Sequence, residues 1–371
     1  MTTSLPRISL CLIVRDEADA LPRFLQAAQG CWDELCAVDT GSTDQTVALL
    51  EAAGARVTHR PWDDDFSAAR NASLDLATGD WILILDPDEL PQPGFAPALR
   101  AAVADPQAGA LLLSLRNLLS DGHHRDCRLL RAFRRDASVR FEHRIHEDAG
   151  RTVGAMLARR GLHLRPVPGR VLHEGYLRAR AVGRDKRARD RRILTEAIAA
   201  DPTDLYLRFK LLEQARFWSD GELLRSTAAA TVQDLAVDSE LAAPLPQVPW
   251  GGELLTLLAE GTSDDPDDQL ALLDGWAPAV APGPALSLRR AELLEQLGRL
   301  DDAVIAYQRC LEMPSDGTPQ RTTTRPLLGL VRVALLQGRL DDARALCASA
   351  LRLSPEDGEA RHAATALGVA L

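Results

Sequence analysis

The chain has 371 residues, 46% of them hydrophobic and 26% charged, with a formal net charge of −10 at pH 7. This length predicts about two domains with ordinary cores. The longest apolar runs fall short of the roughly 18 residues of a membrane span, and the start is not that of a signal peptide, so we expect a soluble, cytoplasmic protein. The six scattered Cys form no Cys-x-x-Cys pair, so we expect neither a disulfide framework nor a structural zinc.

The first ninety or so residues alternate between strand and helix patterns. Short apolar runs indicate buried strands, whereas apolar residues at helical spacing indicate the segments between them. Strands are expected at 8–14, 35–39, 56–60 and 81–85, and helices at 18–28, 47–53 and 66–77. This alternation predicts an α/β sheet of the mononucleotide-binding kind.

The strand pattern at 81–85 ends abruptly in carboxylates, at Asp86, Asp88 and Glu89. Ligands of open α/β sheets bind at the edge where such strands leave the sheet. Asp86 and Asp88 are two residues apart and can address one small cavity, where carboxylate oxygens suit Mg²⁺ or Mn²⁺ and the metal can hold a diphosphate. Taken alone, this pattern also fits a charged strand-to-loop junction on a solvated surface.

Another strand pattern, 35–39, delivers Asp39 into a turn. Gly41 permits backbone angles that other residues resist, and Ser42, Thr43 or Asp44 can cap the following helix. The simplest interpretation of Asp39 is a turn acid that precedes a helix.

Four segments, taken together, resemble the successive signatures of bacterial family 2 glycosyltransferases. They are 11–17, 38–44, Pro61-Trp62 with 65–71, and 86–89. The closest resemblance is to the branch with helical repeats behind the catalytic domain, which includes peptide S-glycosyltransferases. The resemblance implies a GT-A fold, a nucleotide-diphosphate sugar donor and inversion at the anomeric carbon.

The resemblance also implies roles for individual residues. Asp39 would accept a hydrogen bond from the base, commonly uracil, Asp86 would lie near the ribose and metal, and Asp88 would bind the metal directly. The other expected nucleotide-binding residues are Val14, Arg15, Glu17, Arg70 and Asn71. A surface salt bridge is the alternative role for Arg70. The chain departs from the family at Asp16 and Pro87, where Asn and Ala are more common.

Two later segments, 141–148 and 171–176, combine histidines with acids. The second resembles a His-x-Gly-Tyr element of the repeat-bearing branch, which makes His173 the expected third metal ligand. An inverting transfer needs a carboxylate base, and Glu147 is the first candidate and Asp148 the second. Alternatively, Glu147 only orients Arg144 or His146. Neither His-Glu pair has the second His of a zinc protease motif.

The central segment is basic. Residues 116–192 hold 21 Arg and Lys against 9 Asp and Glu, about +12 in an acidic chain. A basic lining attracts a diphosphate. Nucleic acid is the weaker option because the cluster lacks the interleaved aromatic residues of a base-stacking platform and the whole chain is acidic, so we predict no nucleic-acid partner. The run 178–192 equally fits the solvated face of a helix.

After residue 185 the strand patterns stop, and amphipathic helices are expected at 193–200, 205–217, 287–297, 301–311, 327–336 and 341–353. The sequence Gly-Arg-Leu-Asp-Asp-Ala occurs at 298–303 and again at 338–343. The 40-residue offset fits a 34-residue tetratricopeptide unit with an enlarged loop at 313–325. Segments 242–249 and 261–268 are expected to be connectors. The sequence thus predicts a GT-A domain over 1–185 and a tetratricopeptide-like domain over 186–371.

The expected activity is metal-dependent transfer of a sugar, most commonly from a UDP donor, to a peptide, protein or glycan acceptor. The repeats suit a peptide or protein acceptor, but homodimerisation or support of the first domain are equal alternatives. The alternative function is a peptide-binding scaffold with a vestigial nucleotide domain. A nucleotidyltransferase should show a Gly-rich basic loop after the first strand, and 15–18 is not such a loop.

Overall fold

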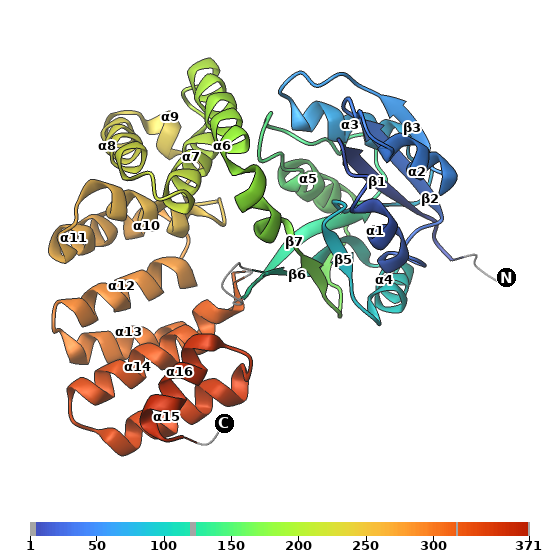
Figure 1. Cartoon of the computed structure of the whole chain (residues 1–371). Helices are drawn as coiled ribbons and strands as arrows, with labels where there is room; N and C mark the ends of the chain where they lie inside the picture. The colour runs from blue at the N-terminus through green and yellow to red at the C-terminus, as the bar shows by residue number, and fades with distance from the viewer. Residues whose placement is uncertain (1–4, 119–123, 317, 370–371) are drawn as a thin grey trace. The chain divides into compact units, whose positions relative to one another are not determined.

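A computed structural model describes residues 5–118, 124–316 and 318–369 (Figure 1). The chain forms two compact units, one that ends at Ile193 and one that begins at Leu194. The boundary predicted at 185 lies inside helix α6 (Gly175–Ala200), which begins in the first unit and ends in the second.

The first unit is built on a mixed sheet with the order β3-β2-β1-β4-β7-β6-β9-β5, and β8 also pairs with β6. The strands are β1 (Ile8–Val14), β2 (Glu34–Asp39), β3 (Arg56–His59), β4 (Trp81–Ile84), β5 (Glu89–Pro91), β6 (Ala108–Leu118), β7 (His124–Arg134), β8 (His163–Pro166) and β9 (Val171–His173). The first four lie parallel to one another. Strand β7 runs antiparallel to both β4 and β6. The four predicted strands are confirmed.

Helices cover both faces of this sheet. Successive side chains of a strand point to opposite faces, so each strand contributes to the core on both sides. In β4, Trp81 and Leu83 join one core cluster, whereas Ile82 and Ile84 join another. The first cluster includes residues of α1 (Leu21–Ala27), α2 (Thr46–Ala52) and α4 (Phe95–Ala104). The second includes residues of α3 (Phe66–Leu76) and α5 (Gly150–Arg160). The predicted α/β domain is therefore a three-layer structure.

Within the described residues of the second unit, every regular element is a helix. Its elements are α7 (Leu205–Phe217), α8 (Gly221–Val237), α9 (Ser239–Ala242), α10 (Gly251–Thr262), α11 (Pro266–Trp276), η1 (Ala277–Ala279), α12 (Pro284–Gln296), α13 (Leu300–Glu312), η2 (Pro319–Thr322), α14 (Thr324–Leu336), α15 (Leu340–Leu353) and α16 (Gly358–Leu367). The expected connector at 242–249 lies between α9 and α10. The one at 261–268 is largely wrong, because α10 extends to Thr262 and α11 begins at Pro266.

The six-residue sequence repeat corresponds to a structural repeat. Gly298 and Gly338 stand between the helices of the pairs α12/α13 and α14/α15, with φ of 71° and 70°, a conformation that side chains disfavour. Each turn continues with the same ion pair, from Arg299 to Asp302 at 2.8 Å and from Arg339 to Asp342 at 3.0 Å. The repeated letters therefore encode one helix-turn-helix unit used twice.

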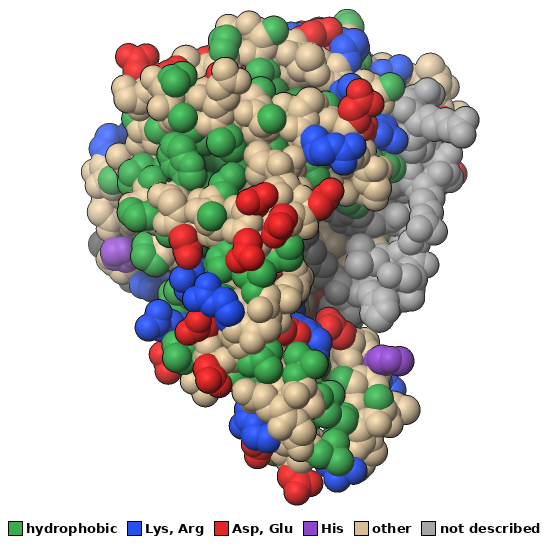
Figure 2. Space-filling view, turned by 90° about the vertical axis from the view of Figure 1, so that its left-hand side faces the viewer, with side chains coloured by type: hydrophobic (Ala, Val, Ile, Leu, Met, Phe, Trp, Pro, Cys, Tyr) green, Lys and Arg blue, Asp and Glu red, His purple; other side chains and the backbone are tan. Residues whose placement is uncertain are grey.

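On the face shown in Figure 2, acidic, basic and hydrophobic side chains are interspersed. No helix among the described residues is long and apolar enough to cross a membrane. The longest, α6, is rich in Arg along its length.

Candidate active site

The loops after β1 and β2 meet at one edge of the sheet. The backbone N–H of Asp16 donates to Ser42 Oγ at 3.0 Å, and Thr43 N–H donates to Asp16 Oδ1 at 2.7 Å. Asp16 has a φ of 51°, a left-handed conformation that Asp and Asn tolerate best after Gly. The departure from Asn at this position therefore keeps the backbone requirement satisfied.

Asp39 ends β2 at this edge and is 3% exposed. Its carboxylate accepts from the N–H groups of Gly41 and Ser42 and lies 3.1 Å from His59 Nδ1. Burial alone would raise the pKa of Asp39, but the hydrogen bonds from Ser42 and His59 outweigh it and hold the pKa below its usual range. Asp39 thus organises its own turn, and His59, from the neighbouring strand β3, is a contact that the sequence did not indicate.

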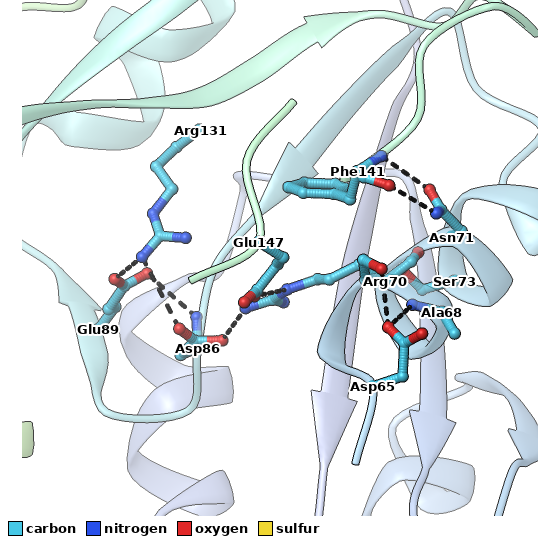
Figure 3. Close-up of polar contacts among 11 residues, drawn as sticks. Asp65, Ala68, Arg70, Asn71, Ser73, Asp86, Glu89, Arg131, Phe141 and Glu147 are labelled. Carbon is cyan, nitrogen blue, oxygen red and sulfur yellow. Dashed lines mark hydrogen bonds and ion pairs between the residues drawn. The ribbon is translucent and has the colours of Figure 1, made fainter. Parts of the chain in front are cut away.

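Arg70, on α3, joins two acids from distant parts of the chain (Figure 3). Its Nη2 donates to Asp86 Oδ1 at 2.5 Å, and its Nε donates to Glu147 Oε1 at 3.1 Å. The Arg70 side chain is only 3% exposed. Its remaining nitrogen, Nη1, is buried without a hydrogen-bond partner among the described residues. Such an orphaned donor is rare in proteins and indicates a place for a further acceptor.

A second ion-pair group adjoins the first, centred on Arg131 from β7. Its Nη2 is bonded to Glu89 and lies 3.7 Å from Asp86 Oδ2. Glu89 is fully buried and accepts the Asp86 N–H at 3.1 Å. Burial would raise the pKa of Asp86, but Arg70 and Arg131 lower it to about 2. Asp86, Glu89 and Glu147 thus face two guanidinium groups, and burial raises the pKa of Glu89 above its usual range.

Asp88 and His173 face each other beside this cluster. His173 Nε2 lies 3.5 Å from Asp88 Oδ2, and His173 Nδ1 lies 2.7 Å from Asn117 Oδ1. The second contact requires the proton on Nδ1 and turns Nε2 toward Asp88, the arrangement that metal-binding histidines commonly show. Strand pairing sets this geometry, because Asn117 on β6 and Glu89 on β5 are both register partners of His173.

Asp88 Oδ2 and His173 Nε2 offer two donor atoms to a divalent cation. Two ligands at about 2.1 Å from an octahedral ion lie about 3 Å apart, close to the Asp88–His173 separation. Mg²⁺ and Mn²⁺ commonly take one or two protein ligands and fill the remaining positions with phosphate and water. No group of three His, Cys, Asp or Glu suited to a metal occurs among the described residues. Asp86, expected near the ribose and metal, has its carboxylate bonded to Arg70.

Asn71 and Asp148 both make hydrogen bonds within the protein. The amide of Asn71, expected to face the nucleotide, donates to Phe141 O at 3.0 Å and accepts from Phe141 N–H at 2.9 Å (Figure 3). Asp148, the second candidate base, is exposed and accepts the N–H of Gly150, the first residue of α5. Glu147 is the acid of this pair that the structure brings to the Arg70 cluster.

The remaining predicted residues line the first loop. Val14 accepts the N–H and hydroxyl of Thr40 through its carbonyl, Arg15 is exposed, and Glu17 N–H donates to Thr46 Oγ1 at 2.7 Å. They lie at the edge where Asp39 ends β2. The side chains of 175–185 are outside the described residues, and so is the first part of the basic run from 178.

Two further residues of this site, Arg131 and Glu89, carried weak sequence signals, and a third, Asn117, carried none. Arg131 interrupts the apolar stretch Leu129 to Phe133. Its ion pair with the buried Glu89 accounts for a charged residue at this position. Glu89 closes the acidic motif, but its complete burial depends on β5 pairing with β9. Asn117 has no local signal, because its role follows only from register across β6 and β9.

Paired acids and a buried arginine lie at the edge where the strands leave the sheet, the edge at which ligands of open α/β sheets bind. Residues 9–152 match the family model described as glycosyl transferase family 2, so this part of the chain is similar to that family. The predicted α/β domain followed by a helical repeat region is confirmed.

Two curated relatives match parts of the chain. A TPR repeat-containing protein of Synechococcus elongatus is 39% identical over 211 residues, which are 56% of this chain and 52% of that protein. The SPbeta prophage-derived glycosyltransferase SunS of Bacillus subtilis is 27% identical over 152 residues, 38% of this chain and 35% of that protein. The chain therefore spans about half, or less, of the length of these relatives.

Solved structures resemble the chain more distantly. A mannosyltransferase from Pyrobaculum calidifontis in complex with GDP-Man and Mn²⁺ is 19% identical, covers 80% of this chain and 81% of that chain, and gives a TM-score of 0.40. A thermophilic TPR protein of Thermus thermophilus is 18% identical, covers 52% of this chain and 95% of that chain, and gives 0.37.

Proposed function

We propose that this protein is a metal-dependent, inverting glycosyltransferase that takes a sugar from a nucleotide-diphosphate donor. The observation that carries the proposal is the fork of Arg70, which holds Asp86 and Glu147 at one edge of the sheet. One acid belongs to the motif assigned to the donor and the other to the segment assigned to the acceptor. A family 2 glycosyltransferase domain over 9–152 supports the same reading.

The donor's base would lie against Asp39 and its diphosphate against Asp88. A charge-assisted hydrogen bond from a ring N–H to the buried Asp39 carboxylate favours a base such as uracil, which offers that donor. The orphaned Nη1 of Arg70 would donate to a donor oxygen. A bound Mn²⁺ or Mg²⁺, held by Asp88 and His173, would stabilise the negative charge that develops on the departing diphosphate.

Glu147 would serve as the base in the transfer. Its carboxylate takes the proton of the acceptor hydroxyl or thiol while the acceptor's lone pair forms a bond to the anomeric carbon. The bond from that carbon to the diphosphate oxygen breaks, and its electron pair leaves with the nucleoside diphosphate. Attack opposite the leaving group gives inversion. The Arg70 Nε contact orients Glu147 for this role.

The acceptor would be a peptide or protein held in part by the helical repeats. Stacked helix pairs present extended surfaces that suit a peptide chain. We place the reaction in the cytoplasm, where nucleotide sugars and reduced thiols are available, and the six cysteines are free in the structure.

The experiment that tests this function is a donor panel. Purified full-length protein is incubated with Mn²⁺ and, separately, UDP-, GDP- and dTDP-sugars, and release of each nucleoside diphosphate is measured. The proposal predicts metal-dependent release from one nucleotide class, with UDP first. A protein that binds a nucleoside diphosphate but releases none from any donor would instead be the vestigial scaffold.

A further inference from the structure

The segment 141–148, which carries Glu147, is a closed loop. The backbone groups of Glu142 and Asp148 bond to each other in both directions, at 2.9 and 3.1 Å. Between them, His143 and His146 have φ of 66° and 54°, left-handed conformations that are uncommon for residues other than Gly. Strained backbone of this kind persists only where surrounding contacts impose it. The contacts that hold this loop therefore decide where Glu147 stands.

The base of the loop is held by Asn71. Its side-chain amide pairs with both the N–H and the C=O of Phe141, as a neighbouring strand would (Figure 3). With these two bonds, the Asn71 oxygen and nitrogen each have a partner within the protein. This is the residue's most specific interaction in the structure.

The tip of the loop is held by residues just before Asn71 in the chain. The N–H of Phe66 donates to the carbonyl of Arg144 at 2.7 Å, and Arg144 Nη2 donates to the carbonyl of Asp63 at 3.1 Å. The carboxylate of Glu147 itself accepts from Arg70 Nε.

All these contacts come from one short stretch, 63–71, that begins in a loop and continues as the first turns of α3. The helix is a firm support, because its N-cap Asp65 accepts the Ala68 N–H at 2.9 Å and its apolar side packs into the sheet core. The same helix positions Asp86 through Arg70. One rigid element thus relates the donor-side and acceptor-side carboxylates.

We propose that the 65–71 motif is a cradle for the 141–148 loop, and that Asn71 is a positioning residue that sets the place of Glu147 rather than a nucleotide ligand. This inference rests on the proposed function of Glu147 as the base. Of the Arg-Asn pair, it moves Asn71 from the nucleotide side to the acceptor side of the reaction. Displacement of a catalytic group by about 1 Å lowers turnover by about 10²-fold, so the cradle has a measurable effect.

The first test compares Asn71→Ala with Asp75→Ala in the full-length protein. Asp75 lies one turn further along α3 and makes an exposed ion pair with Arg140, next to the loop, so it is a matched control. We expect Asn71→Ala to lower kcat for donor turnover by about 10- to 100-fold, with unchanged UDP affinity by calorimetry, and Asp75→Ala to change neither. A loss of UDP affinity at unchanged kcat would overturn the proposal in favour of a nucleotide ligand.

A double-variant comparison shows whether Asn71 acts through Glu147. If it does, Asn71→Ala added to Glu147→Gln slows turnover no further, because the group it positions is already disabled. Two losses that multiply would contradict the cradle and indicate an independent effect.

A second test needs no activity at all. Hydrogen–deuterium exchange of amides 142–148 should accelerate in Asn71→Ala but not in Asp75→Ala. Phe66→Pro should accelerate this exchange more than Phe66→Ala. Both variants remove the ring, but only proline removes the N–H that donates to the Arg144 carbonyl. Proline is tolerated here because Phe66 is the first residue of α3. Unchanged exchange in Asn71→Ala would overturn the cradle. If no donor is turned over but the loop loosens, the proposed function fails while the cradle stands.

Discussion

Arg70 and Glu147 lie 77 positions apart in the chain, yet the Nε of Arg70 donates to Oε1 of Glu147 at 3.1 Å while the same guanidinium holds Asp86. The planar fork of an arginine can address two carboxylates in fixed directions, which a lysine ammonium cannot do. The two acids therefore keep a defined relation before any substrate arrives.

We expect Arg70→Lys to lower donor turnover by about 10²-fold, because the charge remains but the geometry of the two acids is lost. The measurement is kcat at saturating donor, with the melting temperature as a control for folding. A variant with turnover within about threefold of the wild type would show that the fork is only structural.

Asp39→Ala should weaken UDP binding by about 1–3 kcal/mol, since it removes a buried, charge-assisted acceptor from the expected base site. Isothermal titration calorimetry with UDP measures the change. The matched control is Glu34→Gln, which alters the opposite end of the same strand, β2. Equal UDP affinity in the wild type and Asp39→Ala would reduce Asp39 to a turn acid.

Asn117→Ala should lower Mn²⁺ affinity by about 10- to 100-fold, because the imidazole of His173 loses the partner that fixes its tautomer. Mn²⁺ binding is followed by electron paramagnetic resonance in the presence of UDP. Asn117→Asp retains a side-chain oxygen that can accept from His173 Nδ1, so this variant should lose much less Mn²⁺ affinity. Identical titrations for the wild type and Asn117→Ala would mean that His173 is oriented by other contacts.

Glu34 gives a prediction for stability against pH. Burial would raise its pKa, but hydrogen bonds from Ser9, Thr78 and Arg56 lower it from 4.5 to about 2. A carboxyl whose pKa is lower in the folded state contributes stability above pH 4.5, and that contribution is lost as pH falls toward 2. Glu34→Gln should therefore be less stable than the wild type by about 1–3 kcal/mol at pH 7, and the gap should close near pH 2. A gap independent of pH in urea unfolding would contradict this.

Much of the catalytic domain was predictable because its signals are local. The strands that end at Val14 and Asp39, and the apolar run before Asp86, are short patterns with acids at their ends, and parallel pairing brings those ends to one edge. Residues whose place depends on strand register were not predictable. Asn117 reaches His173 only because β6 and β9 are neighbours in register.

The Arg-Asn pair shows a different limit. Its position in the sequence identified Arg70 as part of the site, but the segment at 141–148 that Asn71 holds comes seventy residues later. In the helical unit, α10 was not among the predicted helices, and its residues are buried on nearly all sides. The repeat at Gly298 and Gly338 was visible because a left-handed turn demands glycine in both copies.

The most direct test of the account compares donor turnover in the wild type and in Asp88→Ala, with Mn²⁺ and with chelator, using the best donor of the panel. Asp88 lies at a strand-to-loop position with a partly exposed side chain, so the variant should fold normally. The account predicts that the wild type releases nucleoside diphosphate only with metal and that Asp88→Ala releases none above the chelated background. Unchanged, metal-stimulated release by a folded Asp88→Ala protein would contradict it.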